Sequence, residues 1–513
     1  MAVIAIGLLL RLRRAAAGFL NPDEAVIFLV VNQHRVADVW RSVMAHPYPP
    51  LYSVVLYFWS FVGASEFMLR LPSVLFGVGF LWFTFRWIKL AVAAAPALAA
   101  LVILTFSPPA VVLSAEVRPY MLQLFSMSVA LFFLARAFRE RGALNIIWFT
   151  LWLWLSILSH YQAFWFALAA GVYALIRILH RDLPSDAVKT WAALQAATLA
   201  LCLCLFRYHL AKFRGVWLER YGIDGWLRDS YFHAGTDRTA GFIVKTSQAF
   251  FAYFVNPAWL GAAAALLFAT GVILLAWWGI RHRETSMAAF AFLLVFPLCC
   301  MCAAAWRQLY PYGGSRHDSF LFPFAAAGMA IPLAALARRK ALPLILASLL
   351  LVPLWQSQAQ DHRYDIEAAN QRREFMQHAV QYLRDSALPG GIVFANRETG
   401  PLLEYYLGDR RPVPPRQAGD GFSERLIGGY RVVLTDLFSM SPGEFLTECA
   451  RMRKRYGLKP DDPVWAIDAV FGPSVSYAFR NEYPELELQG LRDFGKNVAV
   501  FRVPNWPGAT KTY

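Results

Sequence analysis

Residues 120–138 read YMLQLFSMSVALFFLARAF, a stretch of nineteen residues in which Arg136 is the only charged residue. A helix that crosses the hydrocarbon core of a membrane needs about 20 predominantly apolar residues. The stretch therefore predicts a membrane-spanning helix rather than a helix on the surface of a water-soluble domain.

Similar stretches recur along the first two-thirds of the chain and indicate a polytopic α-helical membrane protein. The first of them is short for a span, which leaves open whether residues precede Met1. The segment Pro49–Gly63 either spans or lies in the membrane interface. We predict eleven spans, at Val3–Leu20, Phe67–Trp87, Val92–Phe106, Tyr120–Phe138, Asn145–Leu158, Ala163–Leu179, Trp191–Phe206, Pro257–Ile280, Met287–Ala305, Phe320–Ala337 and Ala341–Trp355.

The composition agrees with this class of protein. Of the 513 residues 58% are apolar and 16% charged, against about 45–50% and about 25% in soluble domains. Disordered proteins, nucleic-acid-binding proteins and disulfide scaffolds are excluded, because they need more polar residues or more cysteines. The net charge of +15 is then expected in the loops, where positive residues set the membrane topology and bind anions. We expect no nucleic acid as a partner.

The loop charges predict the orientation. If Pro49–Gly63 lies flat, five loops that carry 13 Lys and Arg share one face, and three short loops on the other face carry three. The positive-inside rule then places the amino terminus in the cytoplasm and the C-terminal part outside it. Because the chain has no Asn-x-Ser/Thr sequon, we expect a bacterial envelope and the inner (plasma) membrane.

We predict two domains, a membrane domain over residues 1–355 and an extracytoplasmic α/β domain over residues 356–513. The second alternates helices and strands, which favours a small α/β sandwich. Its expected helices are Tyr364–Arg384, Thr399–Leu407 and Pro442–Tyr456, and its expected strands are Ile392–Asn396, Arg431–Thr435, Val464–Ile467 and Val498–Val503.

Ionisable residues cluster at predicted outer ends of spans, where they are costly and indicate function. The clusters are Asp23 with Glu24, Glu116 with Arg118, His160 with Tyr161, and Arg316-His317-Asp318 after Gly313-Gly314. Carboxylates can deprotonate a hydroxyl or hold a divalent cation, and arginines bind phosphate. Backbone amides near Gly313-Gly314 could add to such an anion site. The set predicts transfer of a group, not specified by these residues, from a lipid phosphate to an acceptor.

Each cluster also has a structural interpretation. Asp23 could cap a helix at Glu24–Val36, and Glu24 could favour the same helix by its charge. Glu116 and Arg118 could pair with each other, and His160 could be a packing residue. Arg316 and His317 could be interfacial. The charges of Arg207–Lys245 fit a solvated loop, which could also cover the acceptor.

Six short motifs, in order, carry a resemblance to a known superfamily. They are NPDE at 21–24, HPYPPLY at 46–52, SEFMLRLP at 65–72, RPY at 118–120, SHY at 159–161 and GGSRH at 313–317. The chain resembles the GT-C superfamily of membrane glycosyltransferases, in the bacterial branch similar to protein O-mannosyltransferases and lipid A aminoarabinose transferases. Tyr48 departs from the relatives, which often read His-Pro-Pro there.

The resemblance implies a polyprenyl-phosphate sugar donor, inversion at the anomeric carbon, and a lipid, glycan or protein acceptor. It implies Asp23 as the base, and we expect Glu24 to be a second catalytic residue. We expect Arg118, Tyr120, Arg316 and His317 to bind the donor phosphate. Glu116, His160, Tyr161 and His46 are candidates for holding the donor sugar or a divalent cation, Mg²⁺ or Mn²⁺.

Two other functions are compatible with a polytopic membrane protein. A flippase of lipid-linked sugars predicts an inverted repeat and ionisable residues near the membrane midplane, and the sequence shows neither. A membrane-anchored scaffold would not need eleven spans. The enzyme hypothesis requires all four clusters to converge on one pocket.

Overall fold

The computed structural model describes residues 1–213, 215, 218–256, 259–336, 366, 369–410, 416–419, 421–459, 461–484 and 488–503. The chain divides into two compact units. The first, here the membrane unit, comprises Met1–Ala15, Trp40–Val55 and Arg70–Ser357. The second, the mixed unit, comprises Ala16–Val39, Leu56–Leu69 and Gln358–Tyr513. Two segments from the first 70 residues therefore fold with the C-terminal part, while the predicted boundary at 355/356 lies outside the described residues.

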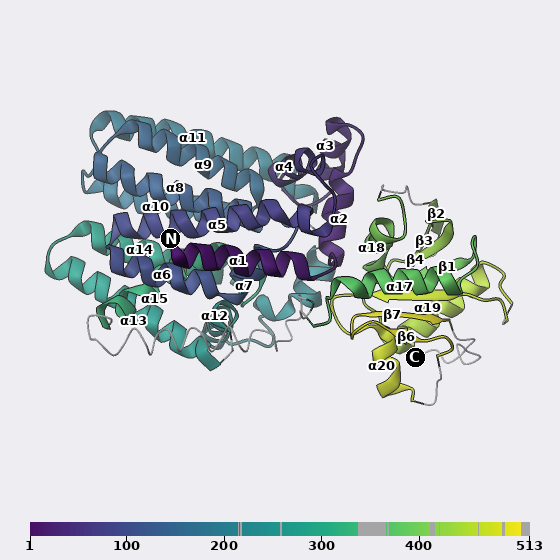
Figure 1. The fold of residues 1–513 in the computed structure, drawn as a ribbon. Coiled ribbons are helices and arrows are strands. Elements are labelled where there is room, and N and C mark those ends of the chain that lie inside the picture. Colours follow the sequence, from purple (N-terminus) through teal and green to yellow (C-terminus); the bar gives the residue numbers. More distant parts are fainter. Residues whose placement is uncertain are drawn as a thin grey trace. The chain divides into compact units, whose positions relative to one another are not determined.

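The described residues up to 336 are helical (Figure 1). Ten of the eleven predicted spans coincide with helices, and the eleventh, Ala341–Trp355, lies outside the described residues. The helices are α1 (Ala2–Ala17), α2 (Pro22–Val31), α3 (Val36–Met44), α4 (Leu51–Ser60), α5 (Glu66–Ala91), α6 (Ala94–Phe106), α7 (Pro108–Leu113), α8 (Tyr120–Glu140), α9 (Ala143–Ser159), α10 (Ala163–Leu179), α11 (Ser185–Tyr208), η1 (Leu210–Phe213), η2 (Leu218–Trp226), η3 (Arg228–Ser230), α12 (Thr239–Val255), α13 (Trp259–Arg281), α14 (Thr285–Trp306), η4 (Arg316–Leu321) and α15 (Phe322–Leu336).

Within the described part of the chain, six helical segments are long and apolar enough to cross a membrane. They are Glu66–Ala91, Tyr120–Glu140, Ser185–Phe213, Trp259–Arg281, Thr285–Trp306 and Arg316–Leu336. The other predicted spans are shorter helices of 13 to 17 residues. Helix α4 has ten residues, about 15 Å of length against a hydrocarbon core of about 30 Å. A straight α4 is therefore too short to span, which agrees with the interfacial alternative for Pro49–Gly63.

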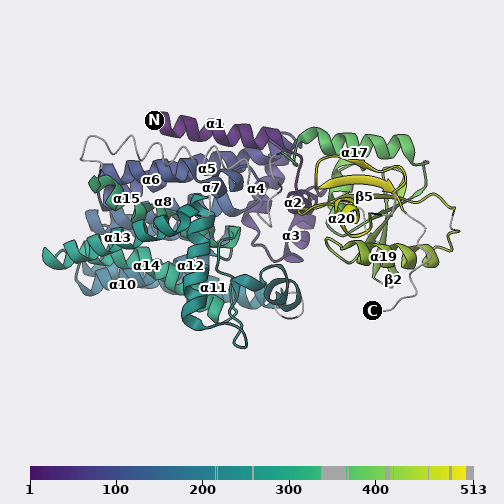
Figure 2. The same cartoon turned by 90° about the horizontal axis from the view of Figure 1, so that it is seen from below.

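The membrane unit is a helical bundle in which α5, α6, α8, α9, α10 and α14 run side by side (Figures 1 and 2). Helix α15 is its most buried long segment and packs against α6, α13 and α14. Helices α13 and α15 approach closely at two glycines, because a Cβ on Gly271 would lie 1.9 Å from the carbonyl oxygen of Gly328. Small residues of this kind allow close packing of membrane helices.

A fully buried arginine joins three helices of the bundle. Pro108 and Pro109 interrupt the helix between α6 and α7. Because proline has no N–H, these two residues leave the carbonyls of Leu104 and Thr105 without their usual helical donors. The guanidinium of Arg11 donates to both carbonyls, at 3.3 and 3.4 Å, and to the hydroxyl of Ser114 at 3.0 Å. Arg11 therefore links α1 to the segment that leads to Glu116 and Arg118.

The C-terminal part of the mixed unit is a seven-stranded sheet in the order β2-β3-β4-β1-β5-β7-β6. Strands β4, β1 and β5 are parallel, and antiparallel strands extend both edges. Its elements are α17 (Arg373–Ser386), β1 (Ile392–Ala395), α18 (Thr399–Tyr406), β2 (Arg416–Gly419), β3 (Phe422–Ile427), β4 (Tyr430–Thr435), α19 (Pro442–Arg455), β5 (Trp465–Ala469), α20 (Val475–Glu482), β6 (Arg492–Asp493) and β7 (Val498–Arg502).

Helices cover both faces of this sheet, with α17 and α19 on opposite sides (Figure 2). Alternate strand residues such as Phe394, Val433 and Phe501 share a core with α19 and α20. Their neighbours Val393 and Val500 are also buried, as expected for a sheet covered on both faces. The α/β sandwich is confirmed. Tyr364, the predicted start of the first tail helix, lies outside the described residues, and the described helix α17 begins at Arg373. Strands β2, β3 and β6 and helix α20 were not predicted.

Candidate functional site

Arg118 lies in the short segment between α7 and α8 of the membrane unit, and its side chain is 2% exposed. Its guanidinium carbon is 5.4 Å from the centre of the Tyr48 ring and 5.6 Å from that of Tyr120. Its Nη2 atom is 3.5 Å from both tyrosine hydroxyls. Cation–π attraction to two rings holds the charge in one place. Tyr48, the residue that departs from the relatives' motif, is thus a partner of Arg118.

His160 ends α9 and stacks obliquely on Tyr120, with the ring centres 5.0 Å apart. The backbone N–H of Gln162 donates to its Nδ1 at 3.2 Å, which leaves Nε2 to carry the proton of the neutral ring. Burial, together with the positive charges of Arg118 and Arg316, lowers the pKa of His160 to about 3. His160 is therefore a neutral hydrogen-bonding group near two arginines.

Arg316 and His317 begin η4, and Gln162 connects this segment to the turn that holds His160. The buried amide of Gln162 donates to the carbonyl oxygen of Arg316 at 3.2 Å and accepts from the hydroxyl of Ser319 at 3.1 Å. His317 lies within electrostatic reach of His160 and Arg118. The structure thus brings together Arg118, Tyr120, His160, Arg316 and His317, here called the arginine–histidine cluster.

The loop before Arg316 is organised by the buried carboxylate of Asp318. One oxygen of Asp318 accepts from the N–H groups of Gly313, Gly314 and Ser315, at 3.1, 2.7 and 3.1 Å. The expectation that these amides add to a site for a bound anion is therefore wrong, because an internal carboxylate already occupies them. Gly314 has φ +87°, and a Cβ there would lie 2.4 Å from the carbonyl oxygen of Ala249.

Two aromatic residues that the sequence did not single out flank the cluster. The guanidinium carbon of Arg316 is 5.7 Å from the centre of the Trp226 ring, and the His317 ring is 5.5 Å from the same side chain. The Tyr310 ring is 6.2 Å from that of His317. Trp226 belongs to Arg207–Lys245, where short helices form and where charged residues such as Arg228 and Lys245 are exposed, as expected for solvated charges. No local pattern marked this tryptophan.

Three other predicted residues of the membrane unit make different contacts. The hydroxyl of Tyr161 is hydrogen-bonded to Nδ1 of His209, near the end of α11. Nδ1 of His46 is 2.8 Å from the carbonyl oxygen of Ser42. Glu116 is buried, and its carbonyl oxygen accepts from the N–H of Arg118 at 2.9 Å. Their predicted role with the donor sugar stays a prediction.

Asp23 and Glu24 lie at the start of α2 in the mixed unit. The N-cap is Asn21, whose side chain accepts from the N–H of Glu24 at 2.9 Å, while the carboxylate of Glu24 accepts from the N–H of Asn21 at 2.9 Å. This capping box satisfies the helix start. The interpretation of Asp23 as the N-cap is therefore wrong. Glu24 is fully buried and takes the structural role, whereas Asp23 is half-buried in the first turn.

The predicted site residues are thus divided between the two units, so convergence on one pocket remains a prediction. Among the residues that the structure describes, no three His, Cys, Asp or Glu side chains gather closely enough to hold a metal ion. The expected divalent cation therefore stays a prediction.

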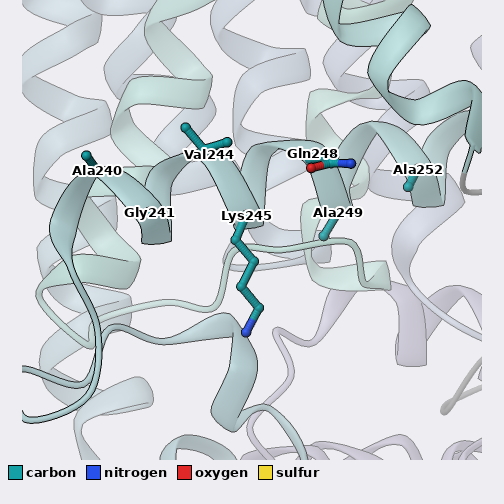
Figure 3. A pocket seen from close by; sticks show the side chains of 7 residues that line it. All are labelled: Ala240, Gly241, Val244, Lys245, Gln248, Ala249 and Ala252. Carbon is teal, nitrogen blue, oxygen red and sulfur yellow. The ribbon is translucent and has the colours of Figure 1, made fainter.

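A groove of about 660 Å³ follows α12 on the membrane unit (Figure 3). Small and apolar residues line most of it, and Lys245 extends away from the helix (Figure 3). The lysine is 3.3 Å from Asp229. None of the predicted site residues lines the groove, although Ala249 at its edge supports the loop of Gly314. The lining residues are Ala240, Gly241, Val244, Lys245, Gln248, Ala249 and Ala252.

Comparisons with known proteins agree with the helical fold. The model of a family described as dolichyl-phosphate-mannose-protein mannosyltransferase matches residues 45–208. The chain is similar to the crystal structure of ArnT from Cupriavidus metallidurans in the apo state, with a TM-score of 0.52, 11% identity, and coverage of 100% of this chain and 98% of ArnT. It is also similar to ArnT bound to undecaprenyl phosphate, with a TM-score of 0.50, 13% identity, and coverage of 100% and 99%. A search of the curated proteins gives no significant match. At sequence identities of 11% and 13%, this structural similarity shows the fold alone.

Proposed function

Starting from a chain with the fold of the GT-C superfamily of membrane glycosyltransferases, we propose that it moves a sugar from a polyprenyl-phosphate donor to an acceptor hydroxyl. The multi-pass membrane part would work in the inner (plasma) membrane, on the face away from the cytoplasm. The acceptor would be a lipid, a glycan or a protein of the cell envelope. The identities of the sugar and the acceptor stay open.

The observation that carries the proposal is the arginine–histidine cluster. Arg118 is buried between two tyrosine rings, and Arg316 and neutral His160 lie within electrostatic reach of each other. Guanidinium groups bind phosphate oxygens bidentately and keep their charge at any physiological pH. Donors fixed in a site with little water stabilise negative charge that grows on a leaving group. The cluster suits a phosphate that gains charge as its bond to the sugar breaks.

Asp23 would act as the general base. The capping box of Asn21 and Glu24 meets the needs of the helix start, so the carboxylate of Asp23 is not required as a cap. In the proposed step the acceptor oxygen forms a bond to the anomeric carbon as the bond from that carbon to the phosphate oxygen breaks. The acceptor proton passes to Asp23, and polyprenyl phosphate leaves with the bonding electrons. One displacement inverts the anomeric carbon.

The donor class is supported by the comparisons: one ArnT structure holds undecaprenyl phosphate, and the matching family is described as using a dolichyl-phosphate sugar. The hydrophobic lipid also suits a bundle of apolar helices. Tyr120 would flank the phosphate beside Arg118, and His317 would add a hydrogen bond from η4. Glu116, Tyr161 and His46 would contribute to the sugar end of the donor.

The test separates binding from chemistry. Purified protein would be given a panel of synthetic undecaprenyl-phosphate hexoses and pentoses, with release of undecaprenyl phosphate as the readout. Asp23→Asn should lower turnover by about 10²–10⁴-fold, the usual contribution of a general base, and leave the affinity for undecaprenyl phosphate unchanged. Asp38→Asn, in the next helix, is the matched control. Undiminished turnover in Asp23→Asn would remove this residue from the mechanism.

A second substitution tests the phosphate site. Arg118→Ala should weaken binding of undecaprenyl phosphate by roughly 10–100-fold, because hydrogen bonds to charged groups contribute about 1.5–3 kcal/mol. The apparent KM for the lipid sugar should rise with it. Equal affinity in Arg118→Ala and the wild-type protein would contradict the assignment of the cluster to the phosphate.

A further inference from the structure

The residues before Asp23 are bound to the C-terminal part of the mixed unit. Gly18 forms an antiparallel bridge with Arg372. The N–H of Phe19 donates to the carbonyl oxygen of Gln371 at 3.0 Å, and the side chain of Gln371 donates back to the carbonyl oxygen of Phe19 at 2.8 Å. Residues 18–20, here called the strap, lead into α2. Their backbone is therefore held by hydrogen bonds to a segment some 350 residues away in sequence.

A tyrosine hydroxyl completes this attachment. The buried N–H of Leu20 donates to the hydroxyl of Tyr406 at 2.9 Å, and that hydroxyl donates to a carboxylate oxygen of Glu66 at 3.2 Å. Glu66 is 4% exposed, and its other oxygen is 3.2 Å from a guanidinium nitrogen of Arg373. The hydroxyl is thus both acceptor and donor, and it connects three separate parts of the mixed unit.

The helix that carries Tyr406 lies against the helix that carries Asp23. Phe28 of α2 and Tyr405 of α18 meet edge to face, with ring centres 5.2 Å apart. Glu398, the residue before α18, lies within electrostatic reach of Asp23. Both ends of α18 therefore act near the start of α2: Glu398 through its charge near Asp23, and Tyr406 through its hydrogen bond to Leu20 in the strap.

We propose that Tyr406 is a positioning residue, whose hydroxyl fixes the strap and thereby the placement of the Asp23 carboxylate. This inference rests on the proposed function, since it assumes that Asp23 is the base. It gives the C-terminal part of the mixed unit a role in the reaction. A misplacement of about 1 Å at a reacting group can reduce a rate by about 10²-fold, so one hydroxyl at the entry to α2 is enough to affect turnover.

Tyr406→Phe removes the hydroxyl and keeps the ring. The expected result is a fall in kcat of about tenfold or more, with an unchanged affinity for undecaprenyl phosphate, because the arginine–histidine cluster belongs to the other unit. Hydrogen exchange at residues 18–24 should become roughly 5–30-fold faster. Glu66→Gln, which keeps an acceptor oxygen, should give a smaller change in the same direction.

Tyr382→Phe is the matched control. Its hydroxyl donates to the carbonyl oxygen of Gly490 at 3.0 Å, in the same unit but away from the strap. Turnover and exchange at residues 18–24 should match those of the wild-type protein. Unchanged exchange and kcat in Tyr406→Phe, or an equal loss in Tyr382→Phe, would overturn the inference. If the wild-type protein turns over no donor of the panel, the proposed function fails, and the exchange result alone decides whether Tyr406 holds the strap.

Discussion

The carboxylate of Asp318 offers a direct test of how the loop before Arg316 is held. Asp318 is fully buried, and one of its oxygens accepts from three successive backbone N–H groups at 2.7–3.1 Å. Asp318→Asn keeps the size of the side chain and one carbonyl oxygen but removes the charge. The three hydrogen bonds then change from charge-assisted to neutral.

The size of the effect follows from that change. Hydrogen bonds to charged groups contribute about 1.5–3 kcal/mol and neutral ones about 1 kcal/mol, so three bonds lose roughly 1.5–6 kcal/mol together. A neutral amide costs less to bury than a carboxylate, which offsets part of the loss. We expect a net local destabilisation of about 2 kcal/mol, equivalent to roughly 30-fold faster exchange of the amides of residues 313–315.

Hydrogen exchange, measured by mass spectrometry on the purified protein, checks this value. The affinity for undecaprenyl phosphate is measured as well, and it should fall because Arg316 follows the loop. Asp186→Asn is the control, since the side chain of Asp186 is 90% exposed and its pairing with Lys189 at 3.6 Å is a surface contact. Exchange at 313–315 that is equal in Asp318→Asn and Asp186→Asn would refute the reasoning.

Three further predictions concern other parts of the chain. Gly314→Ala should destabilise the protein by about 1–2 kcal/mol or more, because the φ angle of Gly314 is positive. Gly171→Ala, with nothing within 4 Å of the new Cβ, should not lower the melting temperature. Equal melting temperatures of the two variants would contradict the prediction. The pKa of Glu398 is raised to about 7, chiefly by burial, so the folded state binds its proton more tightly and stability falls as pH rises from about 4.5 to 7. Glu398→Gln should therefore flatten the change in melting temperature over that interval, and an identical pH profile would contradict the shift. Tyr48→Leu should weaken binding of undecaprenyl phosphate by roughly 2–30-fold, since Arg118 loses a cation–π partner worth about 0.5–2 kcal/mol, while unaltered affinity would show that the ring does not hold the guanidinium in place.

Features that depend on local sequence were predicted from the sequence, and features that depend on distant partners were not. Apolar runs such as Tyr120–Phe138 must be helical in a membrane, because no water is present to satisfy the backbone, and helix α8 covers that run. Strands β1 and β4 were found because β-branched residues lie between turn residues. Strand β3 was missed: its sequence FSERLI carries two charged residues and gains its partners from the hairpin with β4.

The chemistry-bearing residues were found in part. Arg118, His160 and Arg316 stand out because charged or titratable groups are rare beside long apolar runs, and the structure brings them together. Trp226 and Gln162 could not be found this way, because aromatic and amide residues are common near membrane helices. The structural role of Glu24 was one of the two interpretations offered for it, whereas the role of Asp318, whose carboxylate serves its own backbone, was missed.

The sequence by itself determined that the chain is a multi-helical membrane protein with an α/β C-terminal part, since apolar length and alternation are local properties that each segment carries with it. Only the tertiary structure decided that Tyr48 flanks Arg118, that Trp226 flanks Arg316, and that the strap before Asp23 folds with residues near 371 and 406. These contacts join segments tens to hundreds of residues apart, and hydrogen bonds between such segments depend on the packing of whole helices and strands, which no local pattern encodes.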